Sequence, residues 1–346
     1  MTVSITEFFD SIEISDLSAT PKYKQLADSI INGIHHKIFK KGDVLPSINE
    51  ISSFLEVSRD TTEKAYKYLK NKGVIYSAPG KGFFIAVNEL KQGPRIAVLL
   101  NKLSEHKKIV YDAFASEMGE WSALDLFVYN SDISYLKSLL LNFTKTYDHY
   151  VIFPHFKEGA DQAAEIISRY IPSEKLLLLS KLIPDLEGEF PAVFENHEND
   201  IYTALNKAIE HLKKYETIKL VFPDHSDYPK AIIKGFYKFC QEHGIDHTLV
   251  SNLKQEKIKS GTCYINIVER DLALLLEKIL AQKLEVGKDV GIISYNETPL
   301  KKFILNGITT ISTNFEYMGK AAAQLIKNKS KEHVEVPFDI IIRASI

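Results

Sequence analysis

Apolar positions in the first quarter of the chain follow a helical period. After Pro21 they lie three or four residues apart, at Tyr23, Leu26, Ile30, Ile34 and Ile38. This spacing places them on one face of a helix. Proline is favoured at a helix start because its missing N–H needs no partner there. The pattern therefore predicts a first amphipathic helix that begins at Pro21.

Two further helix starts follow. Ser47 with Glu50 three positions later forms a capping box, and Ser58 begins another helix that ends at Gly73. The turn between these two short helices is Glu56-Val57-Ser58, so together they predict a helix-turn-helix.

Two apolar runs come next, at residues 74–76 and 83–87. The turn sequence Pro79-Gly80-Lys81-Gly82 separates them, which is typical of a β-hairpin. A hairpin that follows a helix-turn-helix predicts the wing of a winged helix. We therefore expect a small α+β domain at residues 20–88.

Charge adds to this picture. Residues 20–88 contain eleven Lys or Arg and six Asp or Glu, a net charge of +5, whereas the whole chain carries −2. The excess suits a phosphate backbone, although an ordinary solvated surface explains it equally well. The helix from Ser58 is expected to enter a major groove by its N-terminal end. The candidate DNA-binding residues are Ser47, Asn49, Ser58, Arg59, Thr61, Thr62, Lys64, Pro79, Gly80 and Lys81. For Thr61 and Thr62, plain helix capping is the alternative.

The segment at residues 21–87 resembles the N-terminal domain of GntR-family regulators without a gap. The resemblance rests on motifs in order: Pro21-x-Tyr23, Gly42-Asp43-x-Leu45-Pro46-Ser47, Val57-Ser58-Arg59-x-Thr61, Ala65, Leu69, Gly73 and Gly80-x-Gly82-Phe83. It implies a double-stranded operator DNA as partner. The chain departs from the family at Asn49 and Glu63, where Arg is frequent. Asn suits adenine and Glu accepts from cytosine, so the resemblance implies a different operator sequence.

A polar linker is expected at residues 89–94, and the pattern after it alternates. Short apolar runs predict strands at residues 96–100, 124–129, 150–153, 176–179, 192–194, 219–222, 247–250, 262–265 and 290–294. Helical spacing lies between many of them, at residues 105–118, 133–144, 158–170, 199–214, 227–243, 270–283 and 315–328. Alternating strands and helices predict an α/β domain with parallel sheets at residues 95–346.

This second part resembles the effector domain of LacI/GalR-family regulators. The motifs are Gly235-Phe236 leading to Gly244-Ile245, Ile267-Val268-Glu269-Arg270-Asp271-x-Ala273, residues 290–297, Gly307-Ile308-Thr309-Thr310-Ile311, Met318-Gly319-x-x-Ala322 and Ile342-Arg343-x-Ser345. The resemblance implies a two-lobed, periplasmic-binding-protein-like fold. A GntR-type head on such a body is similar to the arabinose repressor group.

In that fold, ligands bind at the carboxyl ends of the strands. A sugar needs hydrogen-bonding groups and an apolar face, which polar and aromatic residues at these ends supply. The candidate effector-binding residues are Asn101, Glu105, His155, Phe156, Asn196, Asp224, Tyr228, Lys230, Arg270, Asp271, Asn296 and Glu297. Ile232 stands where many sugar-binding relatives have Arg. Lys230 lies nearby, but its ammonium group is a point charge and cannot form the paired hydrogen bonds of a guanidinium. The resemblance implies a monosaccharide such as arabinose or fucose, with a nucleoside, a sugar phosphate or another non-sugar ligand left open.

No sequence motif indicates catalysis. The chain contains no C-x-x-C, H-E-x-x-H, phosphate-loop or G-x-S-x-G motif. We expect no enzyme activity, no cofactor and no metal site. The alternatives are an α/β enzyme that acts on a sugar or sugar phosphate, a sugar-binding module without a DNA role, and a GntR head on an aminotransferase-like body. The last needs a longer chain and a cofactor lysine motif.

The remaining expectations concern location and assembly. The N-terminal arm, residues 1–19, contains four acidic residues and no Lys or Arg, so it has neither the basic start nor the apolar run of a secretion signal. Its apolar residues, Phe8 and Phe9 among them, could pack on the first domain or on a partner subunit. Cys240 and Cys263 are too few for a disulfide framework. With no apolar run long enough for a membrane span, a cytoplasmic protein without a membrane partner is expected. A symmetric homodimer on a pseudo-palindromic operator is also expected.

Overall fold

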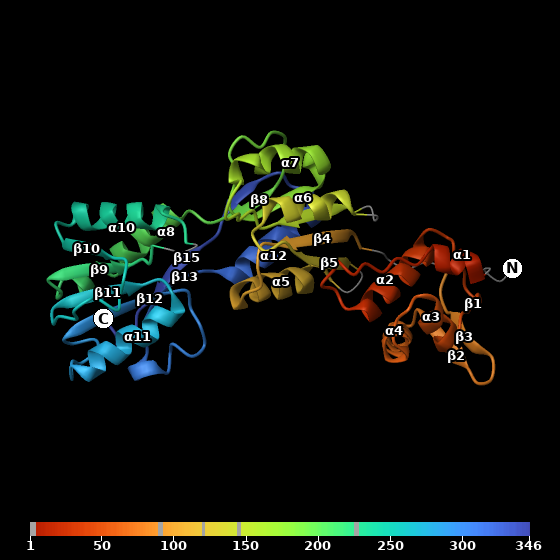
Figure 1. Cartoon of the computed structure of the whole chain (residues 1–346), viewed down its shortest axis with the longest axis horizontal. Coiled ribbons are helices and arrows are strands. Elements are labelled where there is room, and N and C mark those ends of the chain that lie inside the picture. Colours follow the sequence, from red (N-terminus) through yellow and green to blue (C-terminus); the bar gives the residue numbers. More distant parts are fainter. Residues whose placement is uncertain (1–4, 89–92, 120–121, 144–146, 225–227) are drawn as a thin grey trace. The chain divides into compact units, whose positions relative to one another are not determined.

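The chain folds into two compact units. The computed structural model describes residues 5–88, 93–119, 122–143, 147–224 and 228–346 (Figure 1). The first unit comprises Met1–Val193 and Met318–Val334, and the second comprises Phe194–Tyr317 and Glu335–Ile346. The chain therefore passes between the units three times. Residues 1–4 of the predicted arm and 89–92 of the predicted linker lie outside the described residues.

The first unit begins with a winged helix-turn-helix, which we call the head (residues 20–88). Its elements are α2 (Lys22–His35), β1 (Val44–Leu45), α3 (Ile48–Phe54), α4 (Arg59–Asn71), β2 (Ile75–Ala78) and β3 (Gly82–Ile85). The three strands form an antiparallel sheet in the order β1-β3-β2. Leu26, Ile30, Ile51 and Leu69 are fully buried beneath this sheet and its helices. The predicted helix-turn-helix and hairpin are thus confirmed.

The N-terminal arm is part of the head's core. Its helix α1 (Ile5–Asp10) buries Phe8 and Phe9, and Ile12 follows them into the same cluster of side chains. The Phe9 ring stacks on Phe54 with their centroids 3.8 Å apart. Such burial of aromatic surface anchors the arm to the head.

The rest of the first unit is an α/β layer that we call the first lobe. Its strands are β4 (Arg95–Leu100), β5 (Ala123–Val128), β6 (His149–Ile152), β7 (Leu176–Ser180), β8 (Ala192–Phe194) and β14 (His333–Glu335). Its helices are α5 (Glu105–Met118), α6 (Ile133–Leu141), α7 (Ala163–Tyr170) and α12 (Phe315–Lys327), with short 3-10 turns at Ala160–Gln162 and Ser173–Lys175. The sheet order is β14-β8-β7-β6-β4-β5, so β5 is an edge strand.

The second unit, which we call the second lobe, repeats this architecture. Its strands are β9 (Thr217–Val221), β10 (Asp246–Val250), β11 (Thr262–Asn266), β12 (Val290–Tyr295), β13 (Thr309–Thr313) and β15 (Phe338–Ile341). Its helices are α8 (His197–Lys207), α9 (Ile209–Leu212), α10 (Ala231–Glu242) and α11 (Glu269–Ala281), with a 3-10 turn at Ile304–Asn306. The order is β10-β9-β11-β12-β13-β15, and only β15 runs antiparallel to its neighbour among the described pairs.

Close helix packing explains one motif glycine in the second lobe. A side chain added at Gly235 on α10 would place its Cβ 2.0 Å from the carbonyl oxygen of Glu198, which lies on α8. Only glycine allows this approach of the two helices.

The predicted alternation of strands and helices is confirmed, with additions at its margins. The helix expected at residues 105–118 has exactly these bounds as α5, and the strands expected at residues 176–179 and 262–265 are β7 and β11. Strands β13, β14 and β15 were not predicted. Two of these are three or four residues long and lie at sheet edges, where polar residues weaken the apolar signal.

No described helix combines the length and apolar character needed to cross a bilayer.

Candidate nucleic-acid interface and effector site

The recognition helix α4 begins with a hydroxyl cap. The Ser58 side chain accepts a hydrogen bond from the Thr61 backbone N–H at 3.1 Å, and the two hydroxyl oxygens lie 2.8 Å apart. The cap fixes where the helix starts. It therefore places two exposed or half-exposed hydroxyls beside the free N–H groups of the first turn, where a phosphate binds well.

Two ion pairs lie along the exposed side of α4. Arg59 Nε donates to Glu63 Oε1 at 2.9 Å, and Lys64 Nζ lies 2.7 Å from Asp60. The hydrogen bond to Asp60 raises the pKa of Lys64 above its usual value. All four side chains are largely exposed, so these pairs add little stability and can exchange for phosphate contacts. Glu63, which departs from the family pattern, is thus the partner that holds Arg59.

The preceding helix α3 carries the predicted capping box. Ser47 N–H donates to Glu50 Oε2 at 2.7 Å, and Glu50 N–H donates to Ser47 Oγ at 3.3 Å. The hydrogen bond from the Ser47 backbone to the Glu50 carboxylate, with a smaller contribution from the Ser47 side chain, lowers the pKa of Glu50. Asn49 lies between the two residues in the first turn and is exposed. The Ser47 side chain is occupied by capping, whereas that of Asn49 faces solvent.

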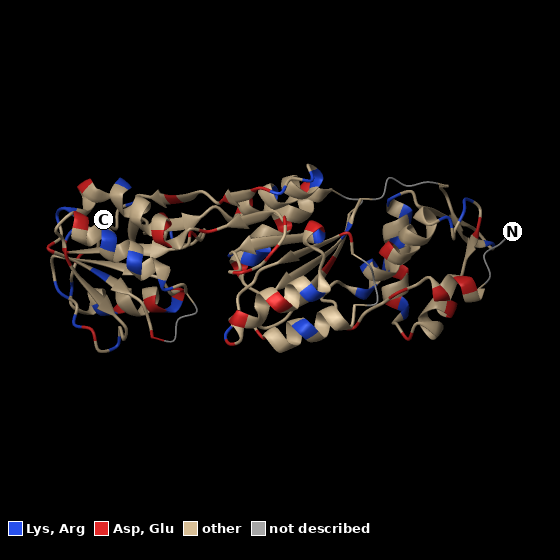
Figure 2. Cartoon of the chain, turned by 90° about the horizontal axis from the view of Figure 1, so that it is seen from above, with Lys and Arg blue, Asp and Glu red and all other residues tan. Residues whose placement is uncertain are grey.

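The wing presents an exposed turn. Pro79, Gly80 and Lys81 are exposed, and the turn closes with a hydrogen bond from the Lys81 N–H to the Ala78 carbonyl at 3.0 Å. Gly80 adopts a φ of +71°, a region that favours glycine. Lys70 on α4 donates to Ser77 Oγ at 2.9 Å and ties the wing to the recognition helix. Basic and acidic positions are interspersed along these elements (Figure 2).

One predicted DNA-binding residue is corrected by the structure. The Thr62 side chain has 0% exposure and packs in the interior of the head. On a helix whose inner face holds Ala65, Tyr66 and Leu69, position 62 falls on that same face. A side chain without exposed surface does not contact DNA, so Thr62 leaves the candidate interface.

In the first lobe, predicted effector residues lie just beyond the carboxyl ends of β4 and β6. Asn101 is buried, and its Nδ2 donates to Ser131 Oγ at 2.9 Å. His155 Nε2 lies 2.9 Å from Ser180 Oγ, at the end of β7. Phe156 is half-buried, whereas Glu105 is exposed at the first turn of α5.

Tyr129 was not predicted as a site residue, yet it contacts the residues that follow β6 in the first lobe. It is fully buried, its ring packs 5.5 Å from Phe156, and its hydroxyl donates to the Phe153 carbonyl. Burial raises its pKa, so the hydroxyl stays protonated. Ser131 and Ser180 were also missed. Sequence alone gives no signal for them, since each is a common loop or strand residue.

In the second lobe, the structure brings two predicted residues together. Asn296 Nδ2 donates to the Tyr228 hydroxyl at 3.1 Å, and Asn296 follows β12 with a φ of +62°. Burial raises the pKa of Tyr228. Its ring lies 5.8 Å from that of Tyr295. An aromatic surface beside an amide is an arrangement that suits a polar ligand with an apolar face.

A buried lysine that was not predicted supports this pair. Lys301 has 0% exposure, and its Nζ donates to the carbonyls of Tyr295 at 3.0 Å and Asn296 at 2.7 Å. It also lies 2.7 Å from Glu269 Oε2, at the start of α11. Lys301 therefore fixes the turn that presents Asn296, which is a positioning role.

Glu297 was predicted to bind the effector but already has strong partners. Arg343 donates to both carboxylate oxygens, at 2.9 and 3.0 Å, and Thr310 donates a further hydrogen bond. Although burial alone raises the pKa of Glu297, these hydrogen bonds lower it below the usual value. Its carboxylate is thus built into the second lobe.

The other predicted residues of the second lobe are more scattered. Asp224, Lys230 and Arg270 are exposed, and Asp271 is half-buried in the first turn of α11. Asn196 is half-buried, and its Nδ2 lies 3.4 Å from Glu335 Oε2.

A buried carboxyl near Asn196 was also missed. Asp200 is 5% exposed, and its Oδ2 has no hydrogen-bond partner among the described residues. Burial and the neighbouring carboxylates of Glu195 and Glu335 raise the pKa of Asp200 to about 7. The hydroxyl of buried Tyr295 likewise has no hydrogen-bond partner within the described part of the chain.

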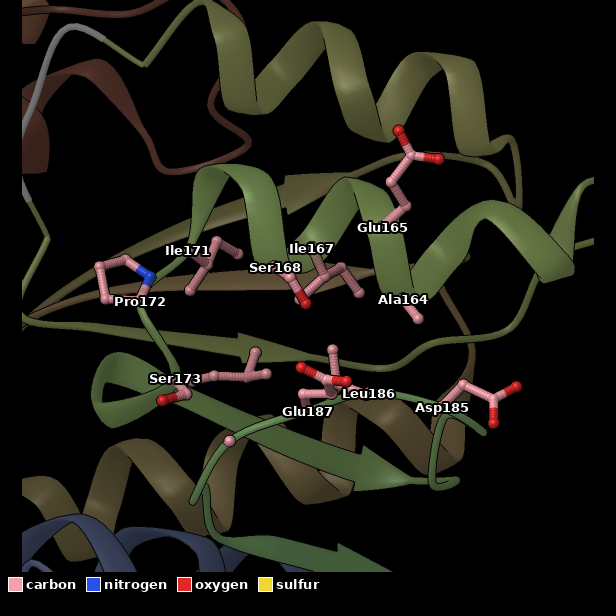
Figure 3. Close-up of a pocket in the computed structure, with 12 residues that line it drawn as sticks. Ala164, Glu165, Ile167, Ser168, Ile171, Pro172, Ser173, Asp185, Leu186 and Glu187 are labelled. Carbon is pink, nitrogen blue, oxygen red and sulfur yellow. The ribbon is translucent and has the colours of Figure 1, made fainter.

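A cavity of about 570 Å³ lies elsewhere in the first lobe, between α7 and residues 185–188. Ile167, Ser168 and Ile171 face Leu186 and Glu187 across it (Figure 3). Its lining includes none of the predicted effector residues. Within the described residues, no group of three or more His, Cys, Asp or Glu side chains could hold a metal ion.

Comparisons with known proteins assign both parts of the chain. Residues 22–85 match the model of the bacterial regulatory proteins of the gntR family, and residues 210–346 match a periplasmic binding protein-like domain. The HTH-type transcriptional regulator YhcF of Bacillus subtilis is 31% identical over 97 residues, which are 27% of this chain and 80% of that protein. The chain belongs to the GntR family. It combines a GntR-type helix-turn-helix head with a periplasmic-binding-protein-like domain.

Other relatives match about a quarter of this GntR-family chain or less. The HTH-type transcriptional repressor YtrA of Bacillus subtilis is 35% identical over 77 residues, 22% of this chain and 59% of that protein. The chain therefore spans less than two thirds of the length of YtrA.

Solved structures similar to this GntR-family chain share its second part. A LacI family regulator from Enterococcus faecalis V583 with bound ribose has 18% identity and a TM-score of 0.56, covering 72% of this chain and 98% of that one. The trehalose repressor from Escherichia coli has 18% identity and a TM-score of 0.58, covering 72% and 100%. At this level of identity the likeness concerns the fold.

Proposed function

We propose that this regulator represses a carbohydrate-utilisation operon and that a small sugar, bound at the carboxyl ends of the lobe strands, controls its affinity for the operator. The observation that carries the proposal is the Tyr228–Asn296 pair at the end of β12. Its amide and aromatic groups are of the kind that recognises a sugar.

The DNA-binding part of the proposal rests on the exposed head residues. Ser58, Thr61 and Arg59 would position the first turn of α4 on phosphates and base edges, with Asn49 beside them. The wing residues Pro79, Gly80 and Lys81 would reach the minor groove. Lys64 would add sequence-independent attraction. Ser47, at the start of α3, remains a candidate contact.

Each lobe by itself carries candidate effector-binding residues. They are Asn101, His155 and Phe156 in the first lobe, and Asn196, Tyr228 and Asn296 in the second lobe. The exposed residues Glu105, Asp224, Lys230 and Arg270, together with half-buried Asp271, are candidates at the margin of this site. The ribose bound to a LacI-family protein of similar fold supports a monosaccharide.

Two copies of the chain are expected to bind a pseudo-palindromic operator in the cytoplasm as a symmetric dimer. Binding of the sugar would change the affinity of the protein for its operator by some factor. Binding of the operator would then change the affinity of the protein for the sugar by the same factor.

The experiment that tests the effector class is a thermal-shift screen against monosaccharides and sugar phosphates. A ligand at 100 times its dissociation constant stabilises a protein by about 2.7 kcal/mol. A monosaccharide that raises the melting temperature of the wild type, and less that of Asn296→Ala, would support the proposal. A response restricted to sugar phosphates, or no response to any compound of the panel, would contradict it.

A further inference from the structure

The arm does more than complete the core of the head, because the residues at its junction with the head bind the first lobe. Ala19 N–H donates to the Leu126 carbonyl at 2.6 Å. The Thr20 hydroxyl donates to the Leu124 carbonyl at 3.2 Å and accepts from the Leu126 N–H at 2.9 Å. We call residues 18–20 the strap. It contacts β5 through backbone and side-chain hydrogen bonds at once.

The position of β5 explains why the strap binds there. β5 is the last strand of its sheet, so one side of its backbone is not paired by another strand. An open edge of this kind readily accepts an added extended segment. The strap occupies this edge through one backbone hydrogen bond from Ala19 and two hydrogen bonds of the Thr20 hydroxyl, and Thr20 is only 6% exposed.

The other side of the strap is fixed to the head. Gln25 on α2 is 1% exposed, and its Nε2 donates to the Thr20 carbonyl at 2.7 Å and to the Ser15 carbonyl at 3.2 Å. Its Oε1 accepts from the Ser15 N–H at 2.8 Å. One buried side chain thus joins the strap to the first helix of the DNA-binding fold.

A second contact lies close to this junction. Glu13 exchanges two hydrogen bonds with Ser29 on α2, at 3.0 and 3.3 Å, and its carboxylate lies 4.0 Å from the guanidinium of Arg95 at the start of β4. The arm therefore contacts α2 on one side and the first two strands of the first lobe on the other.

We propose that the strap is the connection through which the effector-binding part positions the DNA-binding head, with Thr20 as its positioning residue. Thr20 joins the edge strand β5 to Gln25 of the head through three hydrogen bonds. While the strap is bound, it fixes the head to β5; when it is released, the Glu13–Arg95 pair and the chain connection at residues 89–94 remain. This inference rests on the proposed control of DNA binding by an effector.

The test uses the full chain and a DNA fragment that the wild type selects from a random pool. Thr20→Val keeps the shape of the side chain but removes both hydroxyl bonds to β5. Ala19→Pro weakens the strap in a different way, because proline lacks the backbone N–H that donates to the Leu126 carbonyl. Thr203→Val, at a surface hydroxyl of α8 in the second lobe, is the matched control. Thermal melting establishes that each variant is folded.

The readout is amide hydrogen exchange of residues 123–128 with and without the DNA fragment. By reciprocity, DNA bound at the head must act on β5 if the strap couples them. In the wild type and Thr203→Val, DNA is expected to change exchange in this segment by about fivefold or more. In Thr20→Val and Ala19→Pro, this response is expected to disappear while DNA binding persists.

Two results would overturn the inference. One is a wild-type β5 whose exchange is unaffected by DNA; the other is the same response in the wild type and both strap variants. A sugar panel that leaves the wild-type melting temperature unchanged contradicts the proposed effector instead. Because the exchange readout uses no sugar, the two failures are distinguishable.

Discussion

Arg343 and Glu297 form a bidentate ion pair inside the second lobe. The two guanidinium nitrogens of Arg343 donate to the two carboxylate oxygens of Glu297, at 2.9 and 3.0 Å, and both side chains are less than one third exposed. The same guanidinium donates to the Ile308 carbonyl at 2.7 Å. The pair thus joins the C-terminal segment to the turn after β12 and to the start of β13.

Breaking this pair is expected to destabilise the second lobe whether or not an effector is present. Glu297→Gln and Arg343→Met should each lower the free energy of unfolding by about 1–3 kcal/mol, because each leaves a partly buried charge without its partner. Urea denaturation of the two single variants and the double variant measures the coupling between them. A double variant that loses the sum of both single effects would contradict a direct pair.

The ion pair also illustrates what could be predicted from the sequence. The motifs placed Glu297 at the end of a strand and Arg343 in a closing segment, and both positions hold. The residues are 46 positions apart, however. Arg343 reaches Glu297 only because β15 pairs with β13 in the folded chain, and the sequence does not reveal this pairing. A carboxylate at a strand end therefore looked like a ligand-binding group, although a long-range partner already occupies it.

The buried Lys301 gives a second prediction. Lys301→Met should destabilise the second lobe by about 2–4 kcal/mol, because the carbonyls of Tyr295 and Asn296 lose a buried donor. It should also weaken binding of the effector, since Asn296 is no longer held in its turn. Chemical denaturation and ligand titration measure the two effects. Lys302→Met, at the exposed neighbouring position, is the control and should change neither.

Lys301 and Asp200 mark the limit of sequence reasoning at the candidate site. Both are charged residues on patterns that predict a solvent-exposed loop or helix, and both are buried by tertiary packing. Thr62 shows the same limit in the head. It lies in the first turn of α4, which suggested a contact with DNA, but its side chain is on the buried face of the helix. Local patterns located the helices and the strand ends, but burial depends on contacts that only the folded chain makes.

Asp200 predicts a pH dependence of stability. Its pKa is about 7 in the fold against 3.8 in an unfolded chain, so the folded state binds more protons between these values. The contribution of this group to stability therefore falls as pH rises from about 4 to about 7, and the loss is complete above that window. Asp200→Asn keeps the hydrogen bond from Asn196 N–H and carries no charge.

We expect Asp200→Asn to be more stable than the wild type by about 1–3 kcal/mol at pH 8, with the difference vanishing near pH 4. Melting curves from pH 4 to pH 8 measure the trend. Asp161→Asn, an exposed carboxylate of the first lobe, is the control and should show no comparable trend. A gain that is equal at both ends of the range would rule out titration of Asp200 as its cause.

The pairing of Glu63 with Arg59 leads to a prediction about DNA. Because Glu63 holds the guanidinium of Arg59 and adds a negative charge to the recognition helix, Glu63→Gln should raise affinity for random-sequence DNA by about three- to tenfold. The salt dependence should become steeper by about one released counterion, since Arg59 becomes available to a phosphate. Filter binding or fluorescence anisotropy over a salt series measures both quantities.

Glu117→Gln is the charge-matched control, because Glu117 pairs with Lys327 within the first lobe. It changes the net charge of the chain by the same amount and should leave DNA binding unaltered. A Glu63 that reads cytosine would give the opposite pattern, with Glu63→Gln weakening the selected operator by about 1–3 kcal/mol while random DNA binds as before. The comparison of selected and random DNA therefore distinguishes a residue that restrains Arg59 from one that reads a base.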